Sequence, residues 1–216
     1  VGVAYTYSEP LVWYEFVHDC VGLIHERGLV NVLVTNGYIN REPFGELLPY
    51  IDAVNIDLKA FSSEFYKSVC GGDLEPVLRS IRQAYESGCH VELTTLVVPG
   101  LNDSGEEMDS LATWIAALSP DIPLHVSRYF PSYRMTAPPT PMPALQACVE
   151  AARTRLHYVY VGNATVPGGS DTVCPSCGTT VIRRHGYDRV EVLLSDSACP
   201  ECGAGIPVRL HGREPA

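Results

Sequence analysis

The chain of 216 residues is long enough for one substantial domain, or for one domain with a small appendage. Its net charge of −10, without a cluster of Lys and Arg, disfavours nucleic-acid binding, because nucleic-acid binders use positive charge to neutralise phosphates. No apolar run approaches the roughly 18–20 residues that cross a bilayer, so we expect no membrane partner.

Apolar runs of strand length alternate with helix-length segments up to about residue 163. Strands are expected at 1–9, 31–37, 53–60, 90–100, 124–130 and 158–163. Helices are expected at 10–28, 43–50, 62–70, 73–87, 104–118 and about 143–156. This alternation predicts an α/β fold in which helical crossovers join parallel strands. Because several strands are apolar almost throughout, we expect a sheet that is covered on both faces.

Polar or conformationally special residues recur where the predicted strands end. In parallel α/β folds, ligands gather at the carboxyl ends of the strands, so these residues predict a polar ligand there. The alternative is that each strand simply needs a polar exit and a turn. The strand ends, in order, are Tyr7-Ser8-Glu9, Thr35-Asn36-Gly37, Asp57-Leu58-Lys59, Val98-Pro99-Gly100 and Arg128-Tyr129.

Asp57 and Lys59 are two residues apart on a predicted strand, so their side chains point to the same face. Such a pair can hold a ligand that carries an ammonium, a carboxylate or ribose hydroxyls. It can equally be a structural ion pair. A third interpretation is that Lys59 forms a Schiff base with a carbonyl substrate.

Five segments, in this order and spacing, resemble radical S-adenosylmethionine (SAM) enzymes of the branch related to pyruvate formate-lyase activating enzyme. More narrowly, the chain resembles the radical SAM protein of the AmmeMemoRadiSam system, whose chains end in a similar "GN…YCPxCG" segment. The resemblance covers essentially the whole chain, and the ordered set carries it rather than any one motif. The segments are "AYTYSEP", "VTNGYI", "VNIDLKAF", "TTLVVPGLND" and "SRYFPSYRM".

The resemblance implies a partial (β/α) TIM-like barrel over residues 1–163 that holds SAM and a 4Fe–4S cluster. Electron transfer from the cluster would cleave SAM, and the resulting 5′-deoxyadenosyl radical would abstract a hydrogen atom from a substrate. The match places Ser8 and Glu9 at the SAM methionine amino group, and Thr35 and Asn36 near its methionyl group. It places Asp57 and Lys59 at the polar groups of SAM. Pro99 would lie beside the nucleoside, and Arg128 on the last barrel strand.

One departure from the family concerns the cluster ligands. The family binds its cluster with a C-x-x-x-C-x-x-C loop upstream of the segment "YTYSEP", and this spacing does not occur here. Cys20, Cys70, Cys89 and Cys148 are scattered singly and are expected to be ordinary thiols. We therefore expect a fragment that lacks the cluster segment and the first barrel strand, with an open sheet edge in their place.

The remaining cysteines form "CPSCG" and "CPECG", which lie within a predicted small module at residues 173–210. Each motif is typical of a metal-binding knuckle, in which Pro stiffens the turn and Gly permits a positive φ. Four thiolates suit a tetrahedral zinc ion, and iron in a rubredoxin-like site is the alternative. Two disulfides remain a third interpretation, although the clustering favours a reducing, cytoplasmic compartment. The predicted ligands are Cys174, Cys177, Cys199 and Cys202.

Two other functions are compatible with the sequence. One is a non-catalytic, zinc-containing scaffold that binds partner proteins, and the other is a Schiff-base aldolase that uses Lys59. For the radical SAM interpretation, the expected partners are SAM and either a small molecule or a protein substrate. The resemblance also suggests association with Memo-like or AMMECR-like proteins.

Overall fold

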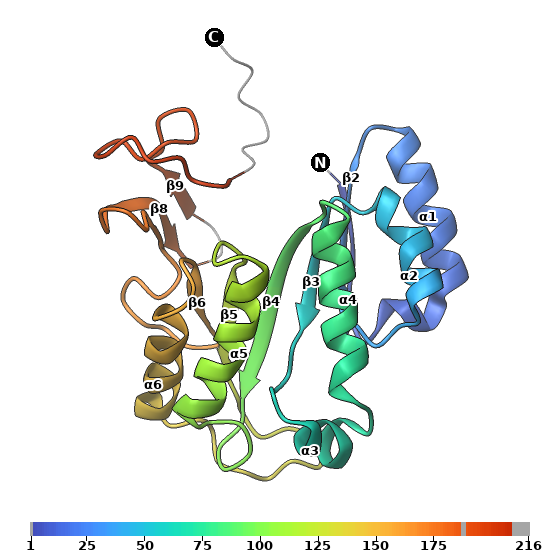
Figure 1. The fold of residues 1–216 in the computed structure, drawn as a ribbon, viewed down its shortest axis with the longest axis horizontal. Coiled ribbons are helices and arrows are strands. Elements are labelled where there is room, and N and C mark those ends of the chain that lie inside the picture. Colours follow the sequence, from blue (N-terminus) through green and yellow to red (C-terminus); the bar gives the residue numbers. More distant parts are fainter. Residues whose placement is uncertain (1, 187–188, 209–216) are drawn as a thin grey trace.

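A computed structural model describes residues 2–186 and 189–208 (Figure 1). Residue 1 of the first predicted strand, and residues 209–210 of the predicted module, lie outside the described residues. The main body is a parallel sheet whose six strands are ordered as in the sequence, which confirms the predicted α/β fold. Its strands are β1 (Gly2–Tyr5), β2 (Val30–Thr35), β3 (Ala53–Asp57), β4 (His90–Val97), β5 (Leu124–Arg128) and β6 (Val159–Gly162).

Each predicted helix is present, although those at 10–28, 43–50 and 62–70 are each split in two. The first segment is a 3-10 turn, η1 (Pro10–Trp13), followed by α1 (Tyr14–Glu26). The segment at 62–70 divides into α3 (Ser63–Phe65) and a π-helical turn, η3 (Tyr66–Cys70), which stops at Gly71 in the left-handed conformation. The other helical elements are α2 (Arg41–Leu47), η2 (Leu48–Tyr50), α4 (Leu74–Glu86), α5 (Gly105–Leu118) and α6 (Met142–Arg153).

The first strand is shorter than predicted. It ends at Tyr5, and Tyr7 and Ser8 have φ values of 66° and 52°. These left-handed conformations cannot continue a strand, so they turn the chain toward η1 and the start of α1.

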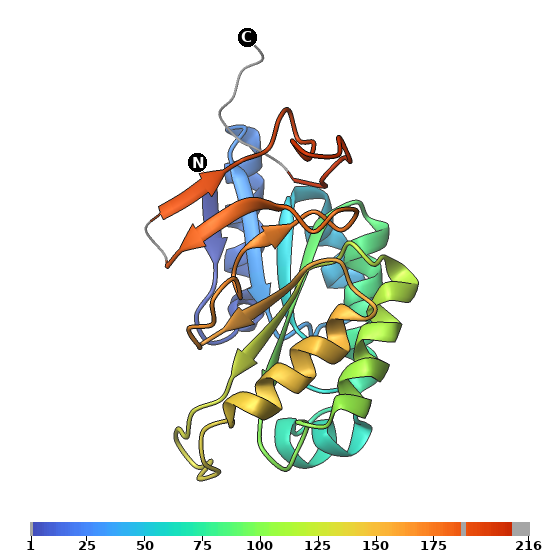
Figure 2. The ribbon, with the colours of Figure 1, turned by 90° about the vertical axis from the view of Figure 1, so that its left-hand side faces the viewer.

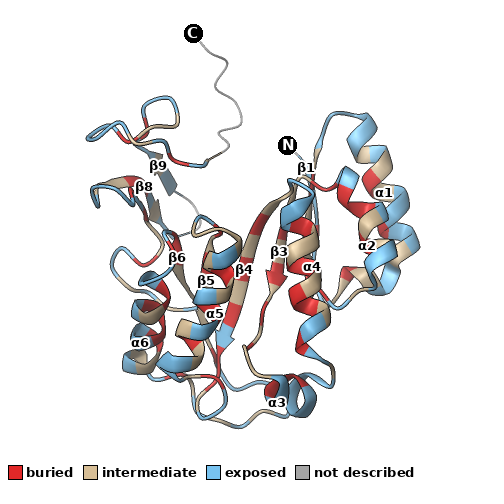
Figure 3. Ribbon diagram, viewed as in Figure 1, coloured by how far each residue is buried: buried red, intermediate tan, exposed pale blue. Residues whose placement is uncertain are grey.

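The helices cover one face of the sheet, because successive crossovers in the same direction share one handedness. Figure 2 shows α4, α5 and α6 on the same side of the strands. Side chains on this side, such as Leu33, Ile56 and Leu93, are fully buried. Figure 3 shows that buried and half-buried residues alternate along β4. The opposite side, here called the open face, carries Asn55 and His125, which are only half-buried. The expectation that the sheet is covered on both faces is therefore wrong for the described residues.

The sheet has a free edge at β1, which pairs only with β2 among the described residues. A groove of about 890 Å³ runs between β1 and α1. Its lining includes the exposed rings of Trp13 and Phe16 and the exposed side chain of Leu23. The expected open edge is thus accompanied by an uncovered apolar helix face.

The C-terminal module is an antiparallel sheet of β7 (Thr172–Val173), β8 (Thr180–His185) and β9 (Arg189–Val192). Its small core includes Val181, Ile182, Cys174 and Cys199, and also Tyr158, which directly precedes β6. The module therefore shares its core with the edge of the main sheet. No helix in the described part of the chain is long and apolar enough to span a bilayer.

Candidate functional site

The end of β2 is tied to the turn after β1 through the Glu9 carboxylate. Glu9 Oε1 accepts hydrogen bonds from Thr35 Oγ1 at 2.7 Å and from the Leu11 backbone N–H at 3.1 Å. Glu9 Oε2 accepts from the Asn36 backbone N–H at 2.7 Å. A carboxylate offers about four lone-pair positions, so three donors leave room for one more. The arrangement thus fixes Asn36 and leaves Glu9 able to accept from a bound cation.

The end of β3 carries the predicted Asp57–Lys59 pair. Lys59 Nζ lies 2.9 Å from Asp57 Oδ2, and both side chains are partly exposed. The backbone of Lys59 is held on both sides: its N–H donates to the Tyr66 hydroxyl at 3.1 Å, and its carbonyl accepts from Asn102 Nδ2 at 2.7 Å. Burial raises the pKa of the Tyr66 phenol, so this hydroxyl stays neutral.

Sequence reasoning missed Tyr66 and Asn102 as supports of the site. Asn102 is buried, and besides Lys59 it bonds the Leu96 carbonyl at 2.9 Å and the Val98 N–H at 2.6 Å. The signal was present, because an Asn that follows a Pro-Gly turn often bonds nearby backbone groups. Its contact with β3, 43 residues away, depends on the fold.

Asn36, Asp57 and Lys59 line one cavity of about 380 Å³ at the carboxyl ends of β2, β3 and β4. Thr35 is buried, and its hydroxyl faces Glu9 rather than the cavity, so these two residues support Asn36 from behind. The cavity combines a paired carboxylate and ammonium with an aromatic and apolar wall. The wall residues include Tyr38, Tyr66, Cys70, Leu96, Val98 and Met135.

Three other predicted residues do not line this cavity. Ser8 is exposed in the left-handed turn after β1. Pro99 lies in the turn after β4, next to Val98, which does reach the cavity. Arg128 donates from Nε to the Thr140 carbonyl at 2.8 Å and lies over the Phe130 ring, so it ties the end of β5 to the segment that precedes α6.

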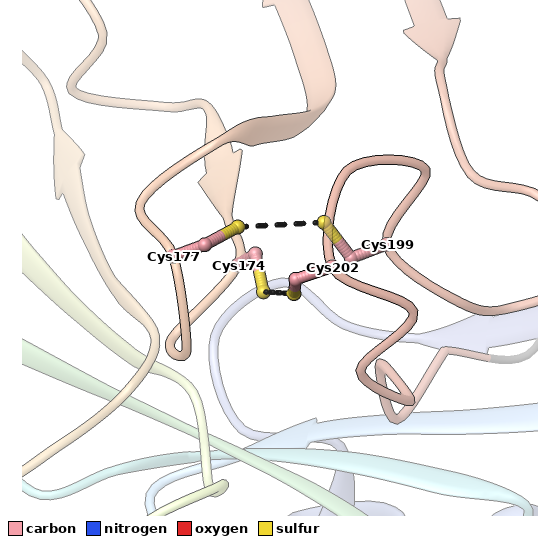
Figure 4. A group of neighbouring side chains, drawn as sticks. All are labelled: Cys174, Cys177, Cys199 and Cys202. Carbon is pink, nitrogen blue, oxygen red and sulfur yellow. Dashed lines mark hydrogen bonds between the residues drawn. The ribbon is translucent and has the colours of Figure 1, made fainter.

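The four clustered cysteines meet as predicted (Figure 4). Their sulfurs all lie within 4.8 Å of one another, and the pairs Cys174–Cys202 and Cys177–Cys199 are each 3.6 Å apart. A disulfide needs about 2.05 Å between sulfurs, whereas tetrahedral zinc with bonds of about 2.3 Å places its sulfurs about 3.8 Å apart. A hydrogen bond with Thr179 lowers the pKa of Cys177 to about 6, whereas the pKa of Cys202 in the same cluster is raised, so without a metal the four thiols ionise unequally. The geometry fits a tetrathiolate metal site.

The other four cysteines do not gather into a second site. Among the described residues, the C-terminal quartet is the one group of Cys, His, Asp and Glu side chains with metal-binding geometry. Cys20, Cys70 and Cys148 lie on α1, η3 and α6, Cys89 lies between α4 and β4, and Cys148 is buried.

Comparison with known proteins gives the family. A model of the Radical SAM superfamily matches residues 1–114. The chain belongs to the radical SAM superfamily. Its curated relatives include the Methanocaldococcus jannaschii protein MJ0808, which is 42% identical over 85% of this chain and 55% of its own length. The 4-hydroxyphenylacetate decarboxylase activating enzyme of Clostridioides difficile is 27% identical over 53% of this chain and 37% of its own length. The chain thus spans about half or less of these relatives.

Solved radical SAM structures share the fold. A domain of a pyruvate-formate lyase-activating enzyme from Bacteroides vulgatus aligns with a TM-score of 0.65 at 21% identity, over 75% of this chain and 99% of that one. Streptococcus suis SuiB bound to S-adenosylmethionine aligns with a TM-score of 0.60 at 14% identity, over 76% of this chain and 40% of that one. At these identities the likeness concerns the fold alone.

Membership of the radical SAM superfamily implies SAM and a 4Fe–4S cluster as cofactors. The cavity at Asn36, Asp57 and Lys59 offers the hydrogen-bonding groups that a nucleoside and an amino-acid moiety require. The described cysteines do not fit the cluster, because three clustered thiolates outside the C-terminal quartet are needed and these residues do not bring them together.

Proposed function

We propose that the protein is a radical SAM enzyme that binds SAM at the cavity lined by Asn36, Asp57 and Lys59. With SAM and a reduced 4Fe–4S cluster both bound, one electron from the cluster would cleave SAM to methionine and the 5′-deoxyadenosyl radical, which would abstract a hydrogen atom from the substrate. The observation that carries the proposal is the convergence of these three side chains on one cavity, within the segment that matches the superfamily. Glu9 and Thr35 act by fixing Asn36. Glu9 does not line the cavity, so its remaining lone pair would accept from the SAM ammonium group only where the methionyl end of SAM extends past Asn36. Ser8, Pro99 and Arg128 remain secondary candidates for SAM contacts.

We also propose that a strand–helix unit carrying the C-x-x-x-C-x-x-C loop packs on the groove between β1 and α1. The free edge of β1 offers unpaired backbone groups, and the groove offers apolar side chains for a covering helix. This addition would extend the open six-stranded sheet into the partial barrel.

For the C-terminal quartet we propose structural zinc. Four sulfur ligands complete a tetrahedral shell and leave no open position for substrate, as in structural zinc sites. A rubredoxin-like iron is the alternative, and the two are separated by metal analysis and by visible absorbance, because zinc has no redox or d–d transitions.

The substrate is the least constrained part of the proposal. Relatives named as activating enzymes act on other enzymes, so a protein substrate is the first to test. Memo-like or AMMECR-like partners, which would place the protein in the AmmeMemoRadiSam system, and a cytoplasmic location, belong to the same proposal. The Schiff-base alternative is less favoured, because the Lys59 amine is already engaged by Asp57 at 2.9 Å. No described contact favours the scaffold alternative.

The decisive experiment measures SAM binding by calorimetry, because binding can be read without the cluster. Asp57→Asn and Lys59→Met should each weaken SAM binding by about tenfold, as expected for loss of one charged hydrogen bond. Lys67→Met is the matched control, because Lys67 is exposed and does not line the cavity. Unchanged affinity in both cavity variants would disprove the assignment. Anaerobic reconstitution of a protein that includes the proposed C-x-x-x-C-x-x-C unit, with 5′-deoxyadenosine as the readout, then tests the chemistry.

A further inference from the structure

A row of side chains on the open face runs from Asp57, at the proposed SAM cavity, across the sheet to the edge strand β6. In the sheet register, Asp57 pairs with Thr94, Thr94 with His125, and His125 with Tyr160. Residues in one such row point to the same side, and neighbouring strands lie about 4.8 Å apart. His125 is therefore about 10 Å from Asp57 across the open face. His125 does not line the cavity itself, but it lies on the same side of the sheet as Asp57.

His125 is held by a carboxylate and by an aromatic ring. Its Nε2 donates to Glu92 Oε2 at 2.7 Å, and the other Glu92 oxygen lies 3.1 Å from His90 Nε2. Burial alone would raise the pKa of Glu92, but the hydrogen bonds from His125 and His90 outweigh it and lower this pKa to about 2. The ring of Tyr160 lies against the His125 ring, with 5.3 Å between centroids and 32° between planes.

Tyr160 is in turn held by the C-terminal module. Its hydroxyl lies 2.9 Å from Thr172 Oγ1, and the guanidinium of Arg184 covers its ring at 5.4 Å. Arg184 also donates from Nη1 to Thr172 Oγ1 at 2.9 Å and to the Ser170 carbonyl at 2.8 Å. These contacts clamp Tyr160 between β7 and β8.

The two residues that hold Tyr160, Thr172 and Arg184, lie on strands that flank the first cysteine knuckle. Thr172 begins β7, two residues before Cys174, and the Cys174 N–H closes a knuckle by donating to the Thr179 carbonyl at 2.8 Å. Arg184 lies on β8, which directly follows that knuckle. The module has only a few buried apolar side chains, so a bound metal must supply much of the order of β7 and β8.

We propose that metal binding at the four cysteines positions the His125 imidazole on the open face, through Thr172, Arg184 and Tyr160. Tyr160 and Arg184 are then positioning residues, and the module governs a substrate-facing group rather than serving as a separate appendage. The relevance of His125 to substrate rests on the proposed radical SAM function. The mechanical link itself does not depend on that function.

The test is NMR of the full chain with ¹⁵N-labelled histidine, in the zinc-loaded form and after chelation, without SAM or cluster. Zinc removal should move the imidazole signals of His125. In Arg184→Ala, the zinc-loaded protein should already show shifted His125 signals, and zinc removal should move them much less. Tyr160→Phe keeps the stacked ring but loses the hydroxyl contact with Thr172, so it should reduce the zinc-dependent shift in part.

The matched control is Arg183→Ala on the same strand, because Arg183 pairs with Glu191 and not with Tyr160. It should retain the full zinc-dependent shift. His125 signals that ignore zinc in the wild type, or a full shift in both Arg184→Ala and Tyr160→Phe, would overturn the proposal. Movement of His25 on α1 together with His125 would show general unfolding and would also contradict a local link. If Arg184→Ala fails to bind zinc, the proposal is judged on Tyr160→Phe, whose full zinc-dependent shift of His125 would overturn it.

Because this experiment contains no SAM, its outcome is independent of the proposed function. If His125 responds to zinc but the protein does not bind SAM, the coupling between the module and His125 holds and its relevance to catalysis is lost. SAM binding without the link would leave the enzyme assignment intact.

Discussion

The Thr35 hydroxyl donates a 2.7 Å hydrogen bond to the Glu9 carboxylate, joining the end of β2 to the turn that follows β1. Thr35→Val keeps the shape but removes this donor from a buried position. We expect a loss of about 1–3 kcal/mol in the free energy of unfolding, measured in urea, together with weaker SAM binding because Asn36 loses its support. Thr35→Ser retains the hydroxyl and should recover most of both. A Val variant as stable as wild type would contradict this role.

Gly37 explains why β2 ends in Asn-Gly. Its φ is +69°, and an added Cβ would lie 2.7 Å from Ile56 Cγ2 on β3. Gly37→Ala should therefore cost more than the about 1–2 kcal/mol of a left-handed conformation alone, because it also displaces the buried Ile56 side chain. Gly71→Ala is the control, because Gly71 has a φ of +71° and open space around its Cβ position. Equal losses in thermal denaturation would show that the close approach does not matter.

Asn102 joins the turn after β4 to the end of β3 through three hydrogen bonds. Asn102→Ala should lower the free energy of unfolding by about 2–4 kcal/mol, because it leaves buried backbone groups unpaired. It should also weaken SAM binding, since the Lys59 backbone is released. Asn40→Ala, at an exposed position without a side-chain cap bond, should change stability by less than about 0.5 kcal/mol.

Removal of one cysteine ligand should abolish metal binding. Cys174→Ser is expected to reduce zinc from about one equivalent to none and to unfold the module, because its small core cannot hold it. Metal content by mass spectrometry, and loss of protection of β8 in hydrogen exchange, check the two effects. Cys70→Ser, which lies outside the quartet, should keep its zinc. Retention of a full equivalent in Cys174→Ser would exclude a four-cysteine site.

Stability should depend on the ionised Glu92. Its pKa is lowered to about 2 in the folded chain, so its stabilising effect is fully present above its unfolded pKa and is lost as the pH falls from about 4.5 toward 2. The effect is at most about 3 kcal/mol, and less because the side chain is partly exposed. Urea unfolding at pH 6 and pH 3 should show a smaller pH-dependent loss for Glu92→Gln than for wild type. Equal losses in the two proteins would show that Glu92 does not contribute.

Much of the fold was readable from local patterns. The strand at 31–37 and the helix at 73–87 were predicted within a few residues, because apolar periodicity and Gly stops act over short distances. The first strand was predicted too long, because no Gly or Asn in "YTYSE" indicates the left-handed conformations of Tyr7 and Ser8. The two-sided cover of the sheet was also predicted wrongly. Val32 and Val34 look buried by composition, yet they face the open side.

Some features of the candidate site were likewise predictable from the sequence, and others were not. Spacing alone identified the cysteine quartet and predicted that Asp57 and Lys59 share a face. The two side chains are paired in the structure, although Lys59 lies just beyond the end of β3. Spacing could not identify Asn102 as the support of Lys59, or separate Asn36 and Asp57 from Pro99 and Arg128 as cavity residues.

The sequence by itself determined the order of strands and helices, the radical SAM resemblance and the pairing of the four cysteines into two C-P-x-C-G motifs, because each is read from short motifs and their order along the chain. Only the tertiary structure decided that Glu9 supports Asn36, that Tyr158 belongs to the core of the module, and that His125 reaches the module through Tyr160. These contacts join separate strands and turns. Their existence depends on how the strands are aligned in the sheet, which no local pattern specifies.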